Sequence, residues 1–191
     1  MSLKSNLVTR KLVLVGVMAA LMSVAAFVRI PIPPVAISLQ SLVVLLSGLV
    51  LGPWLGAASQ IVYILLGLMG LPVFTAGGGL SYLFKPSFGY LLGFIPAAWL
   101  IGRSFHPQQK AEKKKLLGVA ILAHLVIYAI GLPYLYISLR FFAGTPVPFL
   151  TLLKTGFLIF LPGDILKSIF FVAVGQRLAG HHTLASFRES C

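Results

Sequence analysis

Acidic side chains are almost missing from this sequence. Only three of its 191 residues are aspartate or glutamate and only 9% carry a charge, whereas 59% are hydrophobic. A soluble domain of this length needs far more polar surface than so few charged residues can supply. The scarcity of charge therefore excludes an ordinary water-soluble protein and indicates that a lipid bilayer is the solvent.

The sequence also lacks the patterns that enzymes and cofactor proteins need. Its one cysteine is Cys191, so no disulfide can form within the chain. There is no phosphate-binding loop, no cofactor fingerprint, no cysteine–histidine metal spacing and no pair of neighbouring carboxylates. Of the four histidines, only His124 falls within an apolar segment, where we expect it to pack or to form a hydrogen bond. We therefore expect no catalytic residues, no metal and no cofactor.

The charges that are present are mostly basic and give a net charge of +12 at pH 7. They lie in the gaps between apolar segments rather than on one polar face, which argues against a nucleic-acid partner. These apolar segments are 12–28, 37–51, 54–71, 88–101, 116–139 and 150–178. Because a crossing takes about 20 residues, the pattern predicts an all-α integral membrane protein. Residues 1–191 would form a single domain of six transmembrane helices.

Basic residues are concentrated in alternate gaps. The N-terminus carries Lys4, Arg10 and Lys11, the gap 103–115 carries five basic residues, and Arg177 and Arg188 lie near the C-terminus. The positive-inside rule places both termini and the 103–115 loop in the cytoplasm, as in a multi-pass protein of the plasma membrane. The basic run at 110–115 could also dock a partner or anionic membrane lipid, but a topology signal accounts for it without either.

The only aspartate, Asp164, lies in the last apolar segment with Lys167 three positions later. An aspartate at the centre of a bilayer costs about 2.5–3.5 kcal/mol even on lenient scales, so such residues usually face a cavity and serve function. Residues three apart on a helix lie about 5–6 Å apart between Cβ atoms, so Asp164 and Lys167 can pair. Pro162 and Gly163 precede them and predict a kink or a restart of the helix. A structural ion pair within the bundle is the alternative to a binding site.

A glycine-rich segment at 70–90 is predicted to form a loop outside the membrane. Consecutive glycines let backbone amides approach a bound molecule closely, and aromatic rings nearby could cover a pocket. A flexible connector is the alternative to such a lid. Gln40 near the outer end of the second segment offers a further amide donor and acceptor. The candidate binding residues of this region are Gln40, Phe74, Gly77, Gly78, Gly79, Tyr82 and Tyr90.

The first apolar segment carries small residues at a spacing of four. Gly16 and Ala20 form one such pair, and Ala19 and Ser23 form another. Small residues at this spacing let a second helix pack closely. Internal packing and a docking face for a partner protein are both compatible with the pattern.

Three blocks of the sequence together resemble the BioY family, the biotin-specific substrate-binding (S) components of energy-coupling factor (ECF) transporters. They are ISLQSLVVLLSGLVLGPWLG at 37–56, GLPVFTAGGG through FGYLLGF at 70–94, and FLPGDILK at 160–167. The resemblance implies a six-helix subunit that captures biotin outside and delivers it inward with a coupling protein and two ATPases. It also implies that Asp164 accepts ureido N–H groups, that Lys167 donates to the ureido oxygen or to the carboxylate, and that the first helix contacts the coupling protein.

Two other function classes compete with this interpretation. A stand-alone carrier or facilitator for biotin or another small vitamin needs no ATPase, but proton-driven carriers usually need a relay of ionisable residues that the apolar segments lack. An intramembrane enzyme would need the catalytic groups that are missing here.

Overall fold

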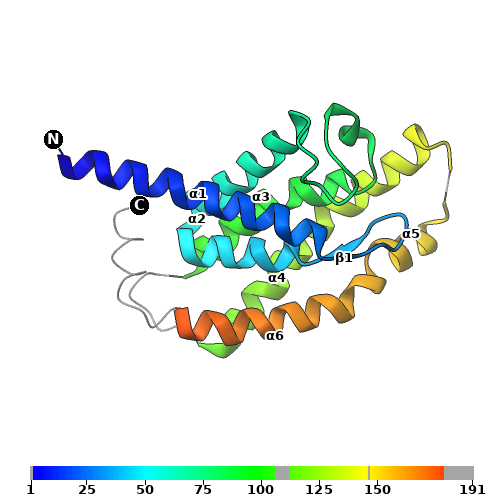
Figure 1. The fold of residues 1–191 in the computed structure, drawn as a ribbon. Coiled ribbons are helices and arrows are strands. Elements are labelled where there is room, and N and C mark those ends of the chain that lie inside the picture. The colour runs from blue at the N-terminus through cyan, green and yellow to red at the C-terminus, as the bar shows by residue number, and fades with distance from the viewer. Residues whose placement is uncertain (1, 106–111, 146, 179–191) are drawn as a thin grey trace.

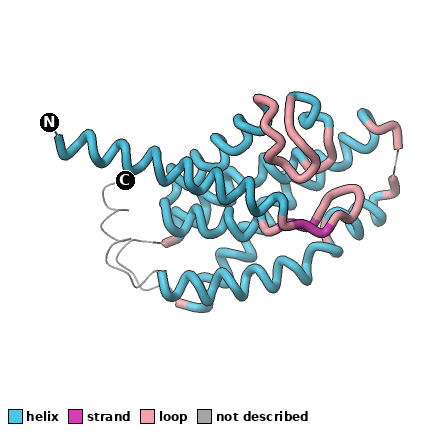
Figure 2. The backbone as a smooth tube through the Cα atoms, viewed as in Figure 1, coloured by secondary structure: helices cyan, strands magenta, loops and turns pink. Residues whose placement is uncertain are grey.

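The computed structural model describes residues 2–105, 112–145 and 147–178 (Figure 1). Most of the described residues are helical, and they include one two-stranded hairpin (Figure 2), so the all-α prediction is confirmed. The predicted basic loop at 103–115 lies partly outside the described residues. Arg188 and Cys191 lie wholly outside them.

The helices are separated by connections of different lengths. In chain order they are α1 (Ser2–Phe27), α2 (Gln40–Leu68), α3 (Phe88–Ser104), α4 (Lys113–Ile137), α5 (Phe149–Gly156) and α6 (Leu161–Leu178). Strands β1 (Arg29–Ile30) and β2 (Ile37–Ser38) pair antiparallel between α1 and α2. A 3-10 turn at Leu80–Phe84 precedes α3, and a π-helical turn at Ser138–Phe142 extends α4.

Four helical stretches among the described residues are long and apolar enough to cross a membrane: Val8–Phe27, Gln40–Leu68, Lys113–Phe142 and Phe149–Leu178. The outer surface of the bundle carries many exposed hydrophobic side chains, among them Leu12, Trp54, Leu166 and Phe170. Such a surface suits lipid rather than water. The structure thus supports a membrane protein, while the count of six crossings remains a prediction.

Helix α2 is broken in the middle at Gly52, whose φ of 81° and ψ of −177° are not helical. Only glycine adopts this conformation readily, and Pro53 follows it. The two arms fold back on each other at this turn. A hydrogen bond joins them, in which Gln60 Nε2 donates to Ser47 Oγ at 2.9 Å. The arms correspond to the predicted segments 37–51 and 54–71. The first arm begins at Gln40 rather than at residue 37, because Ile37 and Ser38 pair with β1.

The last predicted segment is also broken. Helix α5 ends at Gly156, a short turn covers Leu158–Phe160, and α6 restarts at Leu161. Pro162 stands in the first turn of α6, where a missing backbone donor costs no hydrogen bond. The predicted restart is therefore confirmed, with the break at Phe157–Phe160 rather than at the proline itself.

Helix α3 lies in the interior, packed between α2 and α4. Glycines allow this close packing: a Cβ on Gly48 would lie 2.9 Å from the Ile101 Cβ and closer still to the Ala98 carbonyl. On the other side, a Cβ on Gly93 would lie 2.9 Å from the Ile127 Cα. Helices α1 and α6 pack against α2 from outside this layer.

We predict that Gly48→Ala lowers the free energy of unfolding by about 1–3 kcal/mol, because the added methyl group forces α2 away from α3. Gly118→Ala on α4 is the matched control, since a Cβ there meets nothing within 4 Å. The control should be neutral or stabilising by about 0.5–1 kcal/mol. Thermal unfolding in detergent measures both, and equal stability of the two variants would contradict the packing described here.

Candidate functional site

A cavity that is partly open to solvent lies among the β1–β2 hairpin, the start of α2, and helices α3, α4 and α6. Apolar side chains cover much of its wall, including Val35, Leu91, Phe94, Ile127 and Phe160. Its polar groups include Ser38, Gln40, Ser41, His124, Asp164 and Lys167. A concave apolar site with few polar groups is the usual form of a small-molecule site.

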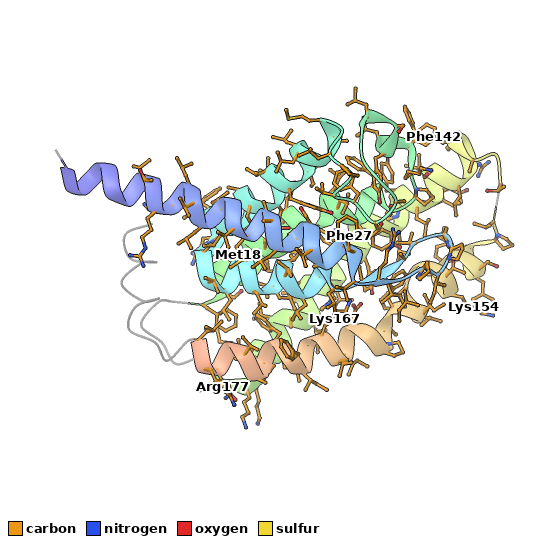
Figure 3. The ribbon with its side chains drawn as sticks, in the orientation of Figure 1. Met18, Phe27, Phe142, Lys154, Lys167 and Arg177 are labelled. Atoms are coloured by element: carbon orange, nitrogen blue, oxygen red, sulfur yellow. The ribbon has the colours of Figure 1, made fainter. Side chains whose placement is uncertain are left out.

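Asp164 and Lys167 form an ion pair on the cavity wall. Lys167 Nζ lies 2.7 Å from Asp164 Oδ1, and each residue is only 6% exposed. Figure 3 shows Lys167 within the bundle, whereas Lys154 and Arg177 lie at its outer edge. The predicted i,i+3 pairing is therefore present and buried.

The Asp164 carboxylate is positioned by the first turn of α6. Because α5 stops at Gly156 and α6 restarts at Leu161, Asp164 falls in the first turn of a new helix. Backbone N–H groups at a helix N-terminus carry a partial positive charge that favours an anion. The interruption between α5 and α6 thus stabilises the negative charge of Asp164, which the apolar surroundings disfavour.

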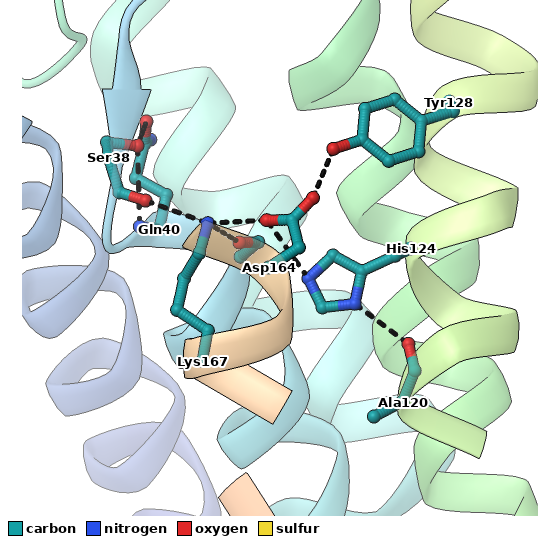
Figure 4. A network of polar contacts seen from close by, with 8 residues as sticks. Ser38, Gln40, Ala120, His124, Tyr128, Asp164 and Lys167 are labelled. Carbon is teal, nitrogen blue, oxygen red and sulfur yellow. Dashed lines mark hydrogen bonds and ion pairs between the residues drawn. The ribbon is translucent and has the colours of Figure 1, made fainter. Parts of the chain in front are cut away.

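Both members of the pair have further partners (Figure 4). Tyr128 donates its hydroxyl to Asp164 Oδ2, and His124 Nε2 lies 3.4 Å from Asp164 Oδ1. Lys167 Nζ donates to Ser41 Oγ at 2.7 Å and to the Ser38 carbonyl at 3.2 Å. The network joins α4 and α6 to the loop that leads into α2.

Gln40 lines the same cavity as the first residue of α2 and is 3% exposed. Its Nε2 donates to the Tyr63 hydroxyl at 2.7 Å, and its Oε1 accepts from Ser38 Oγ at 2.9 Å. Gln40 thereby links the two arms of α2 at the cavity wall. Its amide already has protein partners on both sides.

Aromatic rings form another part of the wall. Tyr90 on α3 lines the cavity and donates its hydroxyl to the Gly156 carbonyl at 2.8 Å. Its ring lies 6.1 Å from Phe160 and 6.2 Å from Tyr128, both of which also line the cavity. Tyr90 thus connects α3 to the break between α5 and α6.

The predicted lid residues Phe74 and Tyr82 are buried behind the cavity wall rather than in it. Phe74 packs between Tyr63 and Tyr82, with ring centroids 5.4 and 4.4 Å away. The Tyr82 hydroxyl lies 3.0 Å from Thr75 Oγ1 and 2.9 Å from Ser87 Oγ, and those two side chains do line the cavity. Tyr82 therefore positions cavity residues, and the loop is fixed by packing.

The three predicted glycines shape this loop without lining the cavity. Gly77 and Gly79 have φ of 104° and 95°, a backbone region that side chains disfavour. Gly78 packs against the backbone of Leu71, where a Cβ would clash. Gly79 N donates to the Gly67 carbonyl at 2.7 Å, which ties the loop to α2. Contact of these glycines with a ligand remains a prediction.

The two small-residue pairs of α1 face different ways. Gly16 and Ala20 are exposed, and a Cβ on Gly16 would meet nothing within 4 Å. Ala19 is buried, and Ser23 donates its hydroxyl to the Ala19 carbonyl at 3.1 Å. Ala19 therefore packs inside the bundle and Ser23 is half-buried, whereas Gly16 and Ala20 are open to a neighbour.

Sequence reasoning missed Tyr128 and gave His124 no role at a site. Both lie on α4 and contact Asp164, which is on α6. Their spacing of four residues puts them on one helix face, and that spacing was the available signal. Nothing in the sequence told which face of α4 meets α6.

Comparison with known proteins gives consistent results. The model of the BioY family matches residues 1–183. A protein of Lysinibacillus sphaericus described as a probable biotin transporter BioY is 39% identical over 170 residues, covering 89% of this chain and 87% of that protein. The biotin transporter BioY of Thermotoga maritima is 35% identical over 170 residues, covering 88% and 95%.

A solved structure agrees with these relatives. The crystal structure of the S-component for biotin from an ECF-type ABC transporter superposes with a TM-score of 0.80 at 28% identity, covering 95% of each chain. The match extends over nearly the whole chain, so the likeness includes the arrangement of the helices around the cavity.

We predict that Lys167→Met lowers the free energy of unfolding by about 3–5 kcal/mol, because it leaves Asp164 as a buried charge without its cation. The double variant Asp164→Asn/Lys167→Met should recover most of that loss. Lys154→Met, at an exposed lysine of α5, is the control and should have little effect. Chemical unfolding in detergent measures all three, and a Lys167→Met protein as stable as the control would refute the charge balance.

Proposed function

The chain belongs to the BioY family, and on that premise we propose that it is the biotin-binding membrane subunit of an ECF transporter. It would capture biotin outside the cell and deliver it inward with an ATP-driven module. BioY proteins are S components of transporters and not enzymes. The chain's relatives are described as biotin transporters, and its structural neighbour is the S-component for biotin.

The observation that carries this proposal is the buried Asp164–Lys167 pair on the wall of an otherwise apolar cavity. The ureido ring of biotin offers two N–H donors and one carbonyl acceptor, and its side chain ends in a carboxylate. A carboxylate makes strong charge-assisted hydrogen bonds to N–H groups, and an ammonium makes them to oxygen. Asp164 and Lys167 thus match the two kinds of polar group in the ligand.

The rest of the cavity suits the apolar part of biotin. Phe94, Tyr90 and Phe160 would pack against the fused rings and the aliphatic chain. Most of the binding free energy would then come from buried apolar surface, and the few polar groups would fix orientation. Gln40, bonded to Ser38 and Tyr63, would hold the cavity wall in shape.

We propose that the chain is a single domain that crosses the plasma membrane six times, with both termini in the cytoplasm. The two arms of α2 provide two of the crossings, and α5 with α6 provides one broken crossing. The basic residues Arg10, Lys11, Arg103 and Arg177 support this orientation by the positive-inside rule. The loop at 70–87 would then lie outside, over the cavity.

We predict that Asp164→Asn weakens biotin binding at least tenfold, about 1.4 kcal/mol. The neutral amide loses the charge-assisted hydrogen bond and leaves Lys167 without a counter-ion. The dissociation constant of the purified protein, measured by titration with biotin, tests this. Glu112→Gln is the matched control, because it makes the same chemical change at an exposed site. Equal affinity of the two variants would remove Asp164 from the binding site.

The coupling protein is proposed to pack against the exposed face of α1. Gly16 and Ala20 leave a flat strip on this face, flanked by exposed Val13, Val17 and Val24. Small residues let two helix backbones approach within the bilayer, where packing drives association. The ATPase pair would act through that coupling protein.

We predict that Ala20→Trp abolishes assembly with the ECF module while biotin binding by the isolated subunit stays unchanged, since α1 does not line the cavity. Ile169→Trp, at an exposed position on α6, is the control and should still assemble. Co-purification and ATP-dependent biotin uptake in liposomes measure the effect. Uptake by liposomes that contain this chain alone would favour a stand-alone carrier instead.

A further inference from the structure

His124 is a buried titratable residue of the cavity wall for which the proposed function has no task so far. It is 7% exposed and lies on α4, facing Asp164. Its Nδ1 lies 2.9 Å from the Ala120 carbonyl oxygen. A carbonyl oxygen can only accept a hydrogen bond, so Nδ1 carries a proton.

The second ring nitrogen is left without a donor. In neutral imidazole with its proton on Nδ1, Nε2 is an acceptor. Nε2 of His124 has no hydrogen-bond partner among the described residues, and it lies 3.4 Å from Asp164 Oδ1, which is also an acceptor. Two facing acceptors repel each other, and the low dielectric of the protein interior strengthens the repulsion.

The two side-chain donors that contact Asp164, Lys167 and Tyr128, are already engaged. Lys167 donates to Asp164, Ser41 and the Ser38 carbonyl, and Tyr128 donates to Asp164. Tyr90, the nearby hydroxyl from α3, donates to the Gly156 carbonyl. The missing donor is therefore a second proton on the ring, a water molecule or an N–H group of a ligand in the cavity, which is partly open to solvent.

We propose that His124 Nε2 accepts an N–H group of the bound ligand and shares it with Asp164 Oδ1. The inference rests on the proposed function, in which the ligand is biotin and the donor is a ureido N–H. The two N–H groups of a ureido ring point away from each other, so acceptors 3.4 Å apart take the same one.

A proton on Nε2 competes with the ligand in this arrangement. The imidazolium form donates to Asp164 and has no lone pair left to accept the ureido N–H. Acid therefore favours the empty site, and the affinity for biotin falls as the pH decreases. The fall reaches about tenfold per pH unit where the ring of the empty protein is mostly protonated. Lys167, Asp164 and Tyr128 are the other titratable groups that face the ring.

The test is the dissociation constant for biotin from about pH 4 to about pH 8, which includes the range in which histidine ordinarily titrates and extends about one unit below it. Biotin methyl ester is measured in parallel, because it lacks the carboxylate and removes the ligand's own titration. His124→Gln offers a carbonyl acceptor that does not titrate, so it should bind within about threefold of the wild type at every pH. His124→Leu offers no acceptor and should bind about tenfold more weakly at about pH 8, again without pH dependence.

Thermal unfolding of the empty proteins separates this role from a structural one. His124→Leu removes an unpaired buried acceptor, so its melting temperature without biotin should not fall. A structural role would lower the melting temperature and the affinity together. An affinity of the wild type that is constant or rises towards acid pH overturns the proposal, as does a His124→Leu protein that binds like the wild type. Absence of biotin binding at every pH overturns the proposed function as well.

Discussion

A carboxylate and an ammonium buried among apolar helices are the constraint on which the rest of this structure depends. Asp164 and Lys167 lie 2.7 Å apart, almost fully buried, in a chain with only three acidic residues. Replacing a buried pair with apolar residues is often neutral or stabilising, so stability alone does not account for one. A role in binding a ligand in the cavity accounts for the two buried charges.

Breaks in the helices let the fold meet this constraint. Helix α6 restarts just before Asp164, which places the carboxylate at a helix N-terminus. The segment Ile37–Ser38 leaves the helical path, so the Ser38 carbonyl is free to accept from Lys167. In a membrane, non-helical backbone is tolerated only where it is buried in protein or lines a cavity, and both breaks satisfy that rule.

The loop at 70–87 contributes mainly through its packing, and only Thr75 and Ser87 among its described residues line the cavity. Phe74 and Tyr82 are aromatic, as a binding loop would need, but Phe74 packs on Tyr63 and Tyr82 packs on Phe74, behind the wall. Thr75 and Ser87, which carried no signal in the sequence, are the residues that reach the cavity. Residue type alone cannot distinguish a side chain that contacts a ligand from one that positions its neighbour.

The sequence by itself determined that the chain lies in a lipid bilayer, that its fold is helical, and that Asp164 and Lys167 form the ionisable pair of the site. Composition and apolar length decide these features, and a charge in a bilayer is costly enough to be seen in a single chain. Only the tertiary structure decided that His124 and Tyr128 meet Asp164, and that Gly16 faces outward while Ala19 faces inward. These facts depend on which helix faces meet. In an almost wholly apolar chain the faces of a helix differ too little in polarity for the sequence to show which one is buried.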